Sequence, residues 1–348
     1  MLRVESEVVV AGGGPAGSIL AMRLAELGHD VCLIEKESFP REHIGESLPP
    51  SIGPLLSFAG LKDAVEAAGF LRTLGSWVRW QGSLDFRETT TAGYQVARAR
   101  FDTILLDAAR ARGVRIIQPA TFDRDQVQAR MVADATGRRC VSGGTKQVSG
   151  PRSLALYAYW EGQHWKDACS RVEALDDAWI WAAPLGEGKS IVAVFTDPAS
   201  HGKYEDFVRQ AKLIPPGGLA GPVRVCDATP WRSETMAGSE FIRVGEAAFT
   251  IDPLSSQGVQ TAIASALQAA VVVHTVLSRP EDAELAVSFY NARQKAAAVR
   301  HSIIAASLYA QVAAVRPTEF WRKRMECSQR SDLPAPAKIV GDFVQPMD

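Results

Sequence analysis

A glycine-rich turn between two apolar runs constrains this chain more than any other feature. The first run, residues 8–11, leads into Gly12, Gly14 and Gly17, which fit the pattern G-x-G-x-x-G, and a second run follows and ends at Glu35. This order predicts a strand, a tight turn, a helix and another strand. In such a unit the glycines permit the turn, let the backbone approach a pyrophosphate and pack the helix against the strand.

The helix after this turn completes a predicted dinucleotide site. It begins at Pro15 and Ala16, carries leucines at helical spacing and ends at Gly28. Free N–H groups and the helix dipole favour a phosphate at its N-terminus. Glu35 is placed to bind the ribose hydroxyls of an adenosine, and Lys36 adjoins it. The alternative is a glycine turn of a Rossmann-like unit that binds no ligand.

Composition narrows the class of protein. A chain of 348 residues forms one compact unit or two intimately joined domains. The net charge of −1, with both signs interspersed, argues against a nucleic-acid partner. Five scattered cysteines indicate reduced thiols and a cytoplasmic location. The first strand begins too early for a signal peptide, and polar residues interrupt the longest apolar stretch, 262–277, so we expect no membrane span.

The folding units are expected to be discontinuous in sequence. Periodicity predicts helices at residues 51–69, 101–112 and 257–277, a strand and turn at 77–86, and strands at 114–117, 131–137 and 241–245. Residues 154–225 change to β patterning. The predicted fold class is α/β, with a Rossmann-like nucleotide-binding domain, an inserted β-sheet substrate domain and C-terminal helices. The expected boundaries are 1–72, 95–145 and 240–280 for the first domain, 73–94 and 146–239 for the second, and 281–348 for the helices.

A second informative segment follows the last predicted strand. Gly245 and Glu246 lead into a loop at Pro253, and a helix opens at residues 256–259. Its N-terminus therefore points out of an unusually polar loop. Such an end can hold the partial negative charge of a redox ring, as a flavin needs at its pyrimidine side.

Together these motifs resemble the FAD-dependent monooxygenases of the aromatic hydroxylase fold. The resemblance covers residues 1 to about 280 and rests, in order, on residues 12–17, Glu35, 98–102, 134–138 and 245–258. Within that group, residues 39–41, 45–47 and 178–185 look like the tryptophan-halogenase branch. The last of these is close to G-W-x-W-x-I-P, with Ala178 and Ala183 in place of Gly and Ile.

The resemblance implies FAD and a set of residues around it. The adenosine would lie on residues 12–17 and Glu35, Arg41 and Arg98 near the cofactor, Glu246 near the ribityl chain and residues 253–258 beside the isoalloxazine. The family usually has Asp at the position of Glu246. The full set of cofactor-binding candidates is Gly12, Gly14, Pro15, Ala16, Gly17, Glu35, Lys36, Arg41, Ser47, Arg98, Asp134, Gly137, Gly245, Glu246, Pro253, Ser256, Gln257, Gly258 and Val259.

Three residues are candidates for catalysis: His43, Trp181 and Pro253. His43 titrates near neutrality and is either a general base, a flavin contact or a loop-stabilising hydrogen-bond partner. Trp181 belongs to a tryptophan-rich block that is either ordinary sheet core or an aromatic-lined pocket. No closely spaced His and Cys ligands occur, so we expect no metal site.

A missing lysine bears on the reaction. Halogenases resemble one another in a catalytic lysine some thirty residues beyond Gly-Glu-Ser, where it turns hypohalous acid into a directed electrophile. Here residues 76–80 supply none, and no lysine occurs between Lys62 and Lys146. Arginine stays protonated and is a poor nucleophile, so Arg79 is no substitute. Halogenation is therefore retained as an alternative only.

The expected reaction is hydroxylation of an electron-rich, indole-type aromatic through a flavin C4a-hydroperoxide. O2 is the co-substrate, and NAD(P)H or a separate reductase supplies electrons. The sequence of residues 252–270 looks most like that of the flavoproteins that oxygenate a tryptophan of a partner enzyme during tryptophylquinone biogenesis. The substrate is thus a free aromatic molecule or a tryptophan-bearing protein. A saturase or dehydrogenase of the same fold, and a non-catalytic FAD-binding partner, stay open as alternatives.

Overall fold

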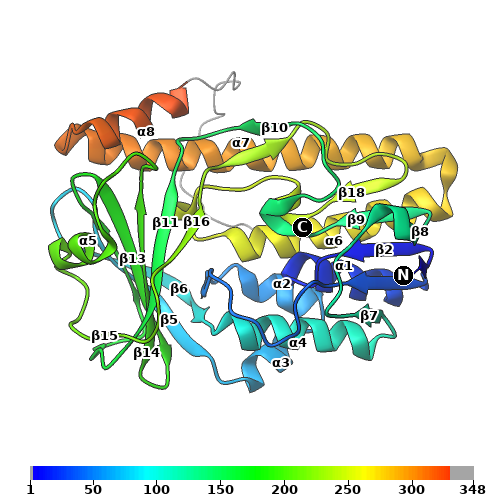
Figure 1. Ribbon diagram of the computed structural model, residues 1–348, viewed down its shortest axis with the longest axis horizontal. Helices are drawn as coiled ribbons and strands as arrows, with labels where there is room; N and C mark the ends of the chain where they lie inside the picture. Colours follow the sequence, from blue (N-terminus) through cyan, green and yellow to red (C-terminus); the bar gives the residue numbers. More distant parts are fainter. Residues whose placement is uncertain (1–2, 330–348) are drawn as a thin grey trace.

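The computed structural model describes residues 3–329 and builds them around two sheets (Figure 1). The first sheet has five parallel strands, because its chain crosses over through helices between them. Its strands are almost entirely buried, as a sheet covered on both faces requires. In spatial order they are β18 (Phe241–Arg243), β9 (Met131–Asp134), β2 (Val8–Ala11), β3 (Val31–Ile34) and β7 (Arg115–Ile117).

Three helices cover one face of the five-stranded sheet. They are α1 (Pro15–Glu26), α4 (Arg98–Ala111) and α6 (Gly258–Ser278), and they share one apolar core with the strands. The small parallel pair β1 (Val4–Glu5) and β8 (Val127–Gln128) adds apolar cover on the opposite face. The helices α2 (Ile52–Phe58) and α3 (Lys62–Ala67) pack at the edge of the main core.

The second sheet has nine strands and is mostly antiparallel; β5 and β12 are its parallel neighbours. Its strands are β4 (Ser47–Leu48), β5 (Leu71–Arg79), β6 (Asp85–Gln95), β11 (Leu154–Glu161), β12 (Ser170–Ala174), β13 (Ala178–Gly186), β14 (Lys189–Thr196), β15 (Gly218–Leu219) and β16 (Arg224–Asp227). The helix α5 (Tyr204–Gln210) packs on one face. β10 (Lys146–Val148) and β17 (Trp231–Ser233) form a separate antiparallel pair, and β10 lies near the helix α7 (Ala283–Val315) (Figure 1).

Two C-terminal helices cover the other face of the nine-stranded sheet. The long helix α7 (Ala283–Val315) runs past both sheets, and α8 (Glu319–Gln329) folds back beside its end (Figure 1). The Trp321 ring meets Trp80 edge-on at 5.3 Å, and its Nε1–H donates to Leu175 O at 2.9 Å. The tail is therefore part of the core of the second sheet.

The α/β fold class and its three structural parts are confirmed. The exact domain boundaries stay a prediction. One helix prediction was wrong: residues 51–69 form α2 and α3 with a break, because Gly60 has φ +69° and ends the first helix. The strand and turn expected at 77–86 are the end of β5 and the turn into β6, whereas the strand expected at 131–137 ends at Asp134. Residues 330–348 of the C-terminal segment lie outside the described residues.

Two helices are long and apolar enough to cross a membrane, by length and composition alone. The α6 window is 56% buried and forms the centre of the main core. The α7 window is 33% buried and packs along both sheets. Since each helix has its own place in the folded core, this is weak evidence for a span.

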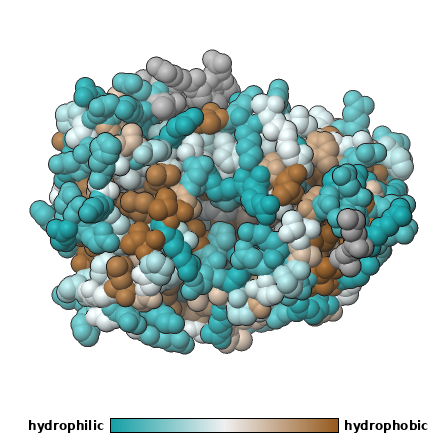
Figure 2. Space-filling view, viewed as in Figure 1, coloured by the Kyte–Doolittle hydropathy of each residue, from teal (hydrophilic) through white to brown (hydrophobic). Residues whose placement is uncertain are grey.

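Apolar surface also gathers over the nine-stranded sheet (Figure 2), where Val225 is 59% exposed.

Candidate active site

The glycine turn between β2 and α1 is held by close backbone packing. A Cβ on Gly17 would lie 1.8 Å from Gly12 O, and one on Gly12, whose φ is +100°, would lie 2.5 Å from Ala135 O. Larger residues therefore cannot occupy these positions without moving the backbone. Helix α1 begins after Gly14 with Pro15 at its first turn and no side-chain cap, so its first N–H groups remain available to an anion.

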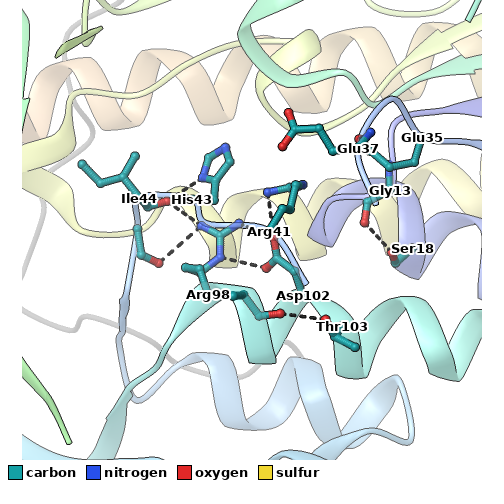
Figure 3. Close-up of polar contacts among 12 residues, drawn as sticks. Gly13, Ser18, Glu35, Glu37, Arg41, His43, Ile44, Arg98, Asp102 and Thr103 are labelled. Carbon is teal, nitrogen blue, oxygen red and sulfur yellow. Dashed lines mark hydrogen bonds and ion pairs between the residues drawn. The ribbon is translucent and has the colours of Figure 1, made fainter. Parts of the chain in front are cut away.

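Glu35 is fixed beside this turn (Figure 3). Its Oε2 accepts a hydrogen bond from Gly13 N at 2.6 Å, and its Oε1 accepts one from Glu37 N at 2.9 Å. Each oxygen of the buried carboxylate keeps a second lone pair for a ribose hydroxyl. Lys36 next to it forms a surface ion pair with Glu37.

Two arginines converge on Asp102 below the turn (Figure 3). Arg98 donates from Nε and Nη2 to the Asp102 carboxylate at 2.8 and 2.9 Å, and from Nη1 to Ile44 O at 2.7 Å. Arg41 Nη1 lies 3.5 Å from Asp102 Oδ2 and is buried without a hydrogen-bond partner. The other end of the Arg41 fork lies 3.4 Å from the position of a Cβ on Gly14. An unsatisfied buried donor at a phosphate-binding turn fits an anionic cofactor.

The segment after Arg41 brings the glycine-turn region to the second sheet. Gly45 has φ +108°, and a Cβ there would lie 2.8 Å from Arg98 Nη1 and 3.8 Å from Val259 Cγ2. Ser47 belongs to β4 and pairs with Gln95 of β6. Arg98, Gly45 and Val259, predicted from three separate motifs, are thus direct neighbours.

Glu46 is a functional candidate that sequence reasoning missed. Its side chain is 1% exposed, and its Oε2 accepts a hydrogen bond from Gly45 N at 2.7 Å. Tyr159 of β11 donates its hydroxyl to Glu46 Oε1 at 3.0 Å. Burial raises the pKa of Glu46 to about 7, although the Arg98 charge opposes the shift. The motif Gly-Glu-Ser pointed to this loop, but nothing in the sequence pairs it with a strand 113 residues away.

The second glycine turn packs directly on the first. A Cβ on Gly245 would lie 2.9 Å from the Cβ of Ala16, and one on Gly137 would lie 3.8 Å from Glu246 Oε2. Burial raises the pKa of Glu246, opposed by the charges of Arg138 and Arg98.

Asp134 has a different setting from its predicted neighbours. Its Oδ1 accepts hydrogen bonds from Thr136 N and Oγ1, and its Oδ2 accepts one from Ser142 N. The carboxylate is therefore used to shape the loop that follows β9.

The loop before α6 is tied to α7. Asp252 Oδ1 accepts from Leu254 N at 3.0 Å, and Tyr309 of α7 donates to Asp252 Oδ2 at 2.8 Å. Burial raises the pKa of Asp252. Pro253 opens a short 3-10 turn, Pro253–Ser255, and Ser256 follows in the left-handed region with φ +50°.

The N-terminus of α6 then faces open space. Gln257 precedes the helix without a side-chain cap, and a Cβ on Gly258 would meet nothing within 4 Å. This turn therefore leaves uncapped backbone N–H groups beside open space at Gly258, where an anionic or polar group can bind.

The three catalytic candidates belong to three different segments of the chain. His43 Nδ1 lies 2.7 Å from Ile44 O, and loss of hydration lowers the pKa of His43 to about 4, with the Arg98 charge adding to the shift. Trp181 is 8% exposed within the core of the second sheet. The structure thus gives His43 a loop hydrogen bond and Trp181 a packing role, and Pro253 alone of the three belongs to the loop before α6.

The tryptophans of the middle block divide between different environments. Trp80 and Trp179 pack with Trp321 of α8 and Tyr309 of α7 in one core, whereas Trp160 and Trp165 pack on the opposite face. They form sheet core in this structure and do not gather around one pocket. Partly buried apolar side chains instead border the same core near the two loops; we call these the junction wall, and they are Ile44, Tyr157, Tyr159, Cys226 and Leu254.

Comparison with known proteins decides the family. The protein-family model described as tryptophan halogenase matches residues 7–88 and 82–339. This chain belongs to the tryptophan halogenase family. A tryptophan 2-halogenase of Chondromyces crocatus is 29% identical over 91% of this chain and 70% of its own length. The flavin-dependent halogenase CmlS has the same fold, with a TM-score of 0.82, 24% identity and coverage of 92% of this chain and 68% of that chain.

One further similar structure belongs to a protein named for another activity. The peptidyl tryptophan dihydroxylase QhpG, described as essential for tryptophylquinone cofactor biogenesis, has a TM-score of 0.74 and 27% identity, with coverage of 92% of this chain and 79% of that chain. Proteins similar to this chain therefore include one named for halogenation and one named for hydroxylation.

As a member of the tryptophan halogenase family, the chain is an FAD-dependent oxidoreductase. It uses FAD with O2 as co-substrate, and NAD(P)H or a separate reductase supplies the electrons. The two glycine turns, the unsatisfied Arg41 and the open N-terminus of α6 fit that cofactor, so the prediction of FAD is confirmed. The individual roles of the predicted site residues stay predictions.

Proposed function

We propose that this member of the tryptophan halogenase family is a monooxygenase that hydroxylates an electron-rich, indole-type aromatic substrate. One observation carries the proposal: every lysine that the described residues include is exposed on the surface. A lysine that converts hypohalous acid into a directed electrophile must reach the dry space between flavin and substrate. No lysine in the described part of the chain has such a position.

The strand expected to carry that lysine is committed to other contacts. Ser76 of β5 shares a hydrogen bond of 2.7 Å with Ser170, and Trp77 Nε1–H donates to Asp167 at 3.0 Å. Arg79 Nε lies 3.6 Å from Glu173 Oε1. These side chains join β5 to the region of β12. None of them supplies an amine nucleophile, because Ser76 and Trp77 have no amine and the guanidinium of Arg79 stays protonated.

FAD, when bound and reduced, supplies the activation of O2. The residues of this chain would hold and orient it: Glu35 the adenosine ribose, Arg41 the phosphates, Glu246 the ribityl chain and the N-terminus of α6 the ring. The junction wall would hold an aromatic ring and exclude water, which protects the reactive oxygen from loss. In this proposal His43 contributes a neutral loop contact and Pro253 shapes the ring-side turn.

The substrate is either a free aromatic molecule or a tryptophan-bearing protein. The similarity to the peptidyl tryptophan dihydroxylase supports the second choice, including a role in quinone cofactor maturation. An indole supplies the electron-rich ring that an electrophilic oxygen attacks. We place the reaction in the cytoplasm, where the scattered cysteines would stay reduced.

Halogenation is the second candidate, and family membership favours it. The two reactions differ in what the product gains. FAD-loaded protein would be reduced chemically or by a separate flavin reductase and given labelled O2, indole-type compounds or a tryptophan peptide, with and without chloride or bromide.

We expect product mass to rise by labelled oxygen regardless of halide. A halide-dependent product carrying chlorine or bromine would contradict the proposed hydroxylation. Product that differs only by hydrogens, formed without O2, would indicate a saturase or dehydrogenase instead. The variant Gly17→Ala, which cannot pack its glycine turn, is the matched control without bound flavin.

A further inference from the structure

The Glu46–Tyr159 pair is a buried acid–phenol contact between the two halves of the molecule. Glu46 belongs to the loop that leads from the glycine-turn region, and Tyr159 belongs to β11 of the nine-stranded sheet. The Tyr159 hydroxyl donates to Glu46 Oε1 at 3.0 Å and lies 3.4 Å from His43 O. Arg98 donates to Ile44 O at 2.7 Å in the same loop, and its charge acts on Glu46.

We infer that Glu46, acting through the hydroxyl of Tyr159, accepts the proton that leaves the aromatic ring when it is substituted. This inference rests on the proposed function and names the proton acceptor of that reaction. Oxygen transfer to a ring carbon breaks aromaticity. The ring C–H bond must then break, its electron pair must return to the ring, and the proton must go to a base in a site that excludes water.

The geometry gives that proton a route. Tyr159 borders the same apolar core as Ile44 and Leu254, the side chains that would hold the substrate ring in the proposed function. As the Tyr159 hydroxyl oxygen takes the ring proton, its own proton passes along the existing hydrogen bond to Glu46 Oε1. Oε2 stays fixed by Gly45 N at 2.7 Å. The oxidant is O2 with reduced FAD, which the enzyme already uses.

The charges around the pair suit a base that is ionised near neutrality and can be protonated. Burial raises the pKa of Glu46 to about 7, and the hydrogen bond from Gly45 N and the charge of Arg98 on α4 oppose that shift. Burial and the Glu46 charge raise the pKa of Tyr159, so the phenol keeps its proton until it relays one. Tyr157 of β11 and Cys226 of β16 also face Glu46, and burial keeps both of them neutral.

The first test compares three substitutions in the FAD-loaded enzyme. Glu46→Gln keeps an oxygen that accepts the Tyr159 hydrogen bond but cannot take a proton. Tyr159→Phe removes the relay. Tyr94→Phe is the matched control, because Tyr94 of β6 also donates its hydroxyl to a glutamate, Glu66 Oε1 at 3.3 Å, outside the proposed site. We expect single-turnover product formation to fall about 100-fold in the first two and to change by less than about threefold in the control.

A ring-deuterated substrate adds a readout that a structural role would not move. In Glu46→Gln, loss of the ring proton becomes slow, so a primary isotope effect should appear that the unmodified enzyme lacks. If Glu46→Gln performs like the unmodified enzyme and only Tyr159→Phe is impaired, the pair merely holds the loop and the inference is wrong.

A second test needs no turnover. Infrared spectra of the FAD-loaded protein across pH should show a carboxylic acid band that titrates near pH 7, is absent in Glu46→Gln and is unchanged in Tyr94→Phe. Absence of that band overturns the inference whatever the enzyme makes. A halogenated product would overturn the proposed hydroxylation but not this role, because halogenation also expels a ring proton.

Discussion

The two halves of the site are built in opposite ways. The adenosine side lies within one short segment, where Glu35 bonds to Gly13 across 22 residues and Gly17 packs on Gly12. The ring side draws on distant segments: Tyr159 meets Glu46 across 113 residues, and Tyr309 meets Asp252 across 57. In the proposed function a local motif would hold the adenosine, whereas long-range packing would shape the region beside the ring.

The largest effect should come from filling the adenosine turn. In Gly17→Ala the new Cβ would lie 1.8 Å from Gly12 O, so the backbone must move. We expect a loss of about 3 kcal/mol or more in the free energy of unfolding and no bound FAD. Gly53→Ala is the matched control, since Gly53 is also helical and a Cβ there meets nothing within 4 Å. Yellow, stable Gly17→Ala protein would show that the turn is not as rigid as described.

The next effect probes the long-range side through α8. Trp321 is fully buried against Trp80, Tyr309 and Phe320. Trp321→Ala should cost about 3–5 kcal/mol of unfolding free energy, measured by denaturant titration, because it leaves a large cavity. FAD affinity should change far less than stability, since the adenosine turn does not contact this residue. An equal loss of both would mean that the two sides are one cooperative unit.

The pH dependence of stability should identify Glu46. Its pKa is raised to about 7 in the folded protein, so the folded state binds the proton more tightly than the unfolded chain does. Its contribution to stability is full below about pH 4.5 and is lost as pH rises through about 7.

Denaturant titrations of the FAD-loaded protein should therefore show the unmodified enzyme losing on the order of 1–3 kcal/mol relative to Glu46→Gln over that window. Parallel pH curves for the two proteins would contradict the burial described for this carboxyl.

The smallest expected effect concerns the adenosine contact alone. Glu35→Gln keeps the size of the side chain but weakens its bonds to Gly13 N and to a ribose. We expect FAD to bind about 10-fold more weakly by fluorescence titration, with little change in reaction chemistry once FAD is saturating. Glu37→Gln should bind FAD normally, because Glu37 contributes only its backbone N–H to Glu35.

The same contrast explains what the sequence could predict. The glycine turn, Glu35 and the flanking strands depend on neighbours close in sequence, and they form as expected. The helix expected at 51–69 fails locally, because the apolar spacing hides the break at Gly60.

Contacts on the ring side could not be predicted in this way. Tyr159 looks like any alternating strand residue, and only the register of β11 places it on the junction wall. The packing of Trp80 against Trp321 likewise depends on α8 folding back onto the sheet, which the sequence does not reveal.

One helix touches nearly every part of this molecule. Tyr290 near the start of α7 bonds to Arg243 O beside the five-stranded sheet, Gln294 bonds to Gln268 of α6, and Tyr309 bonds to the loop at Asp252. A partner that binds α7 and shifts it would therefore move contacts with both sheets and with the loop at Asp252. Shortened versions of the gene that stop before residue 283 should therefore yield insoluble material instead of a smaller working enzyme.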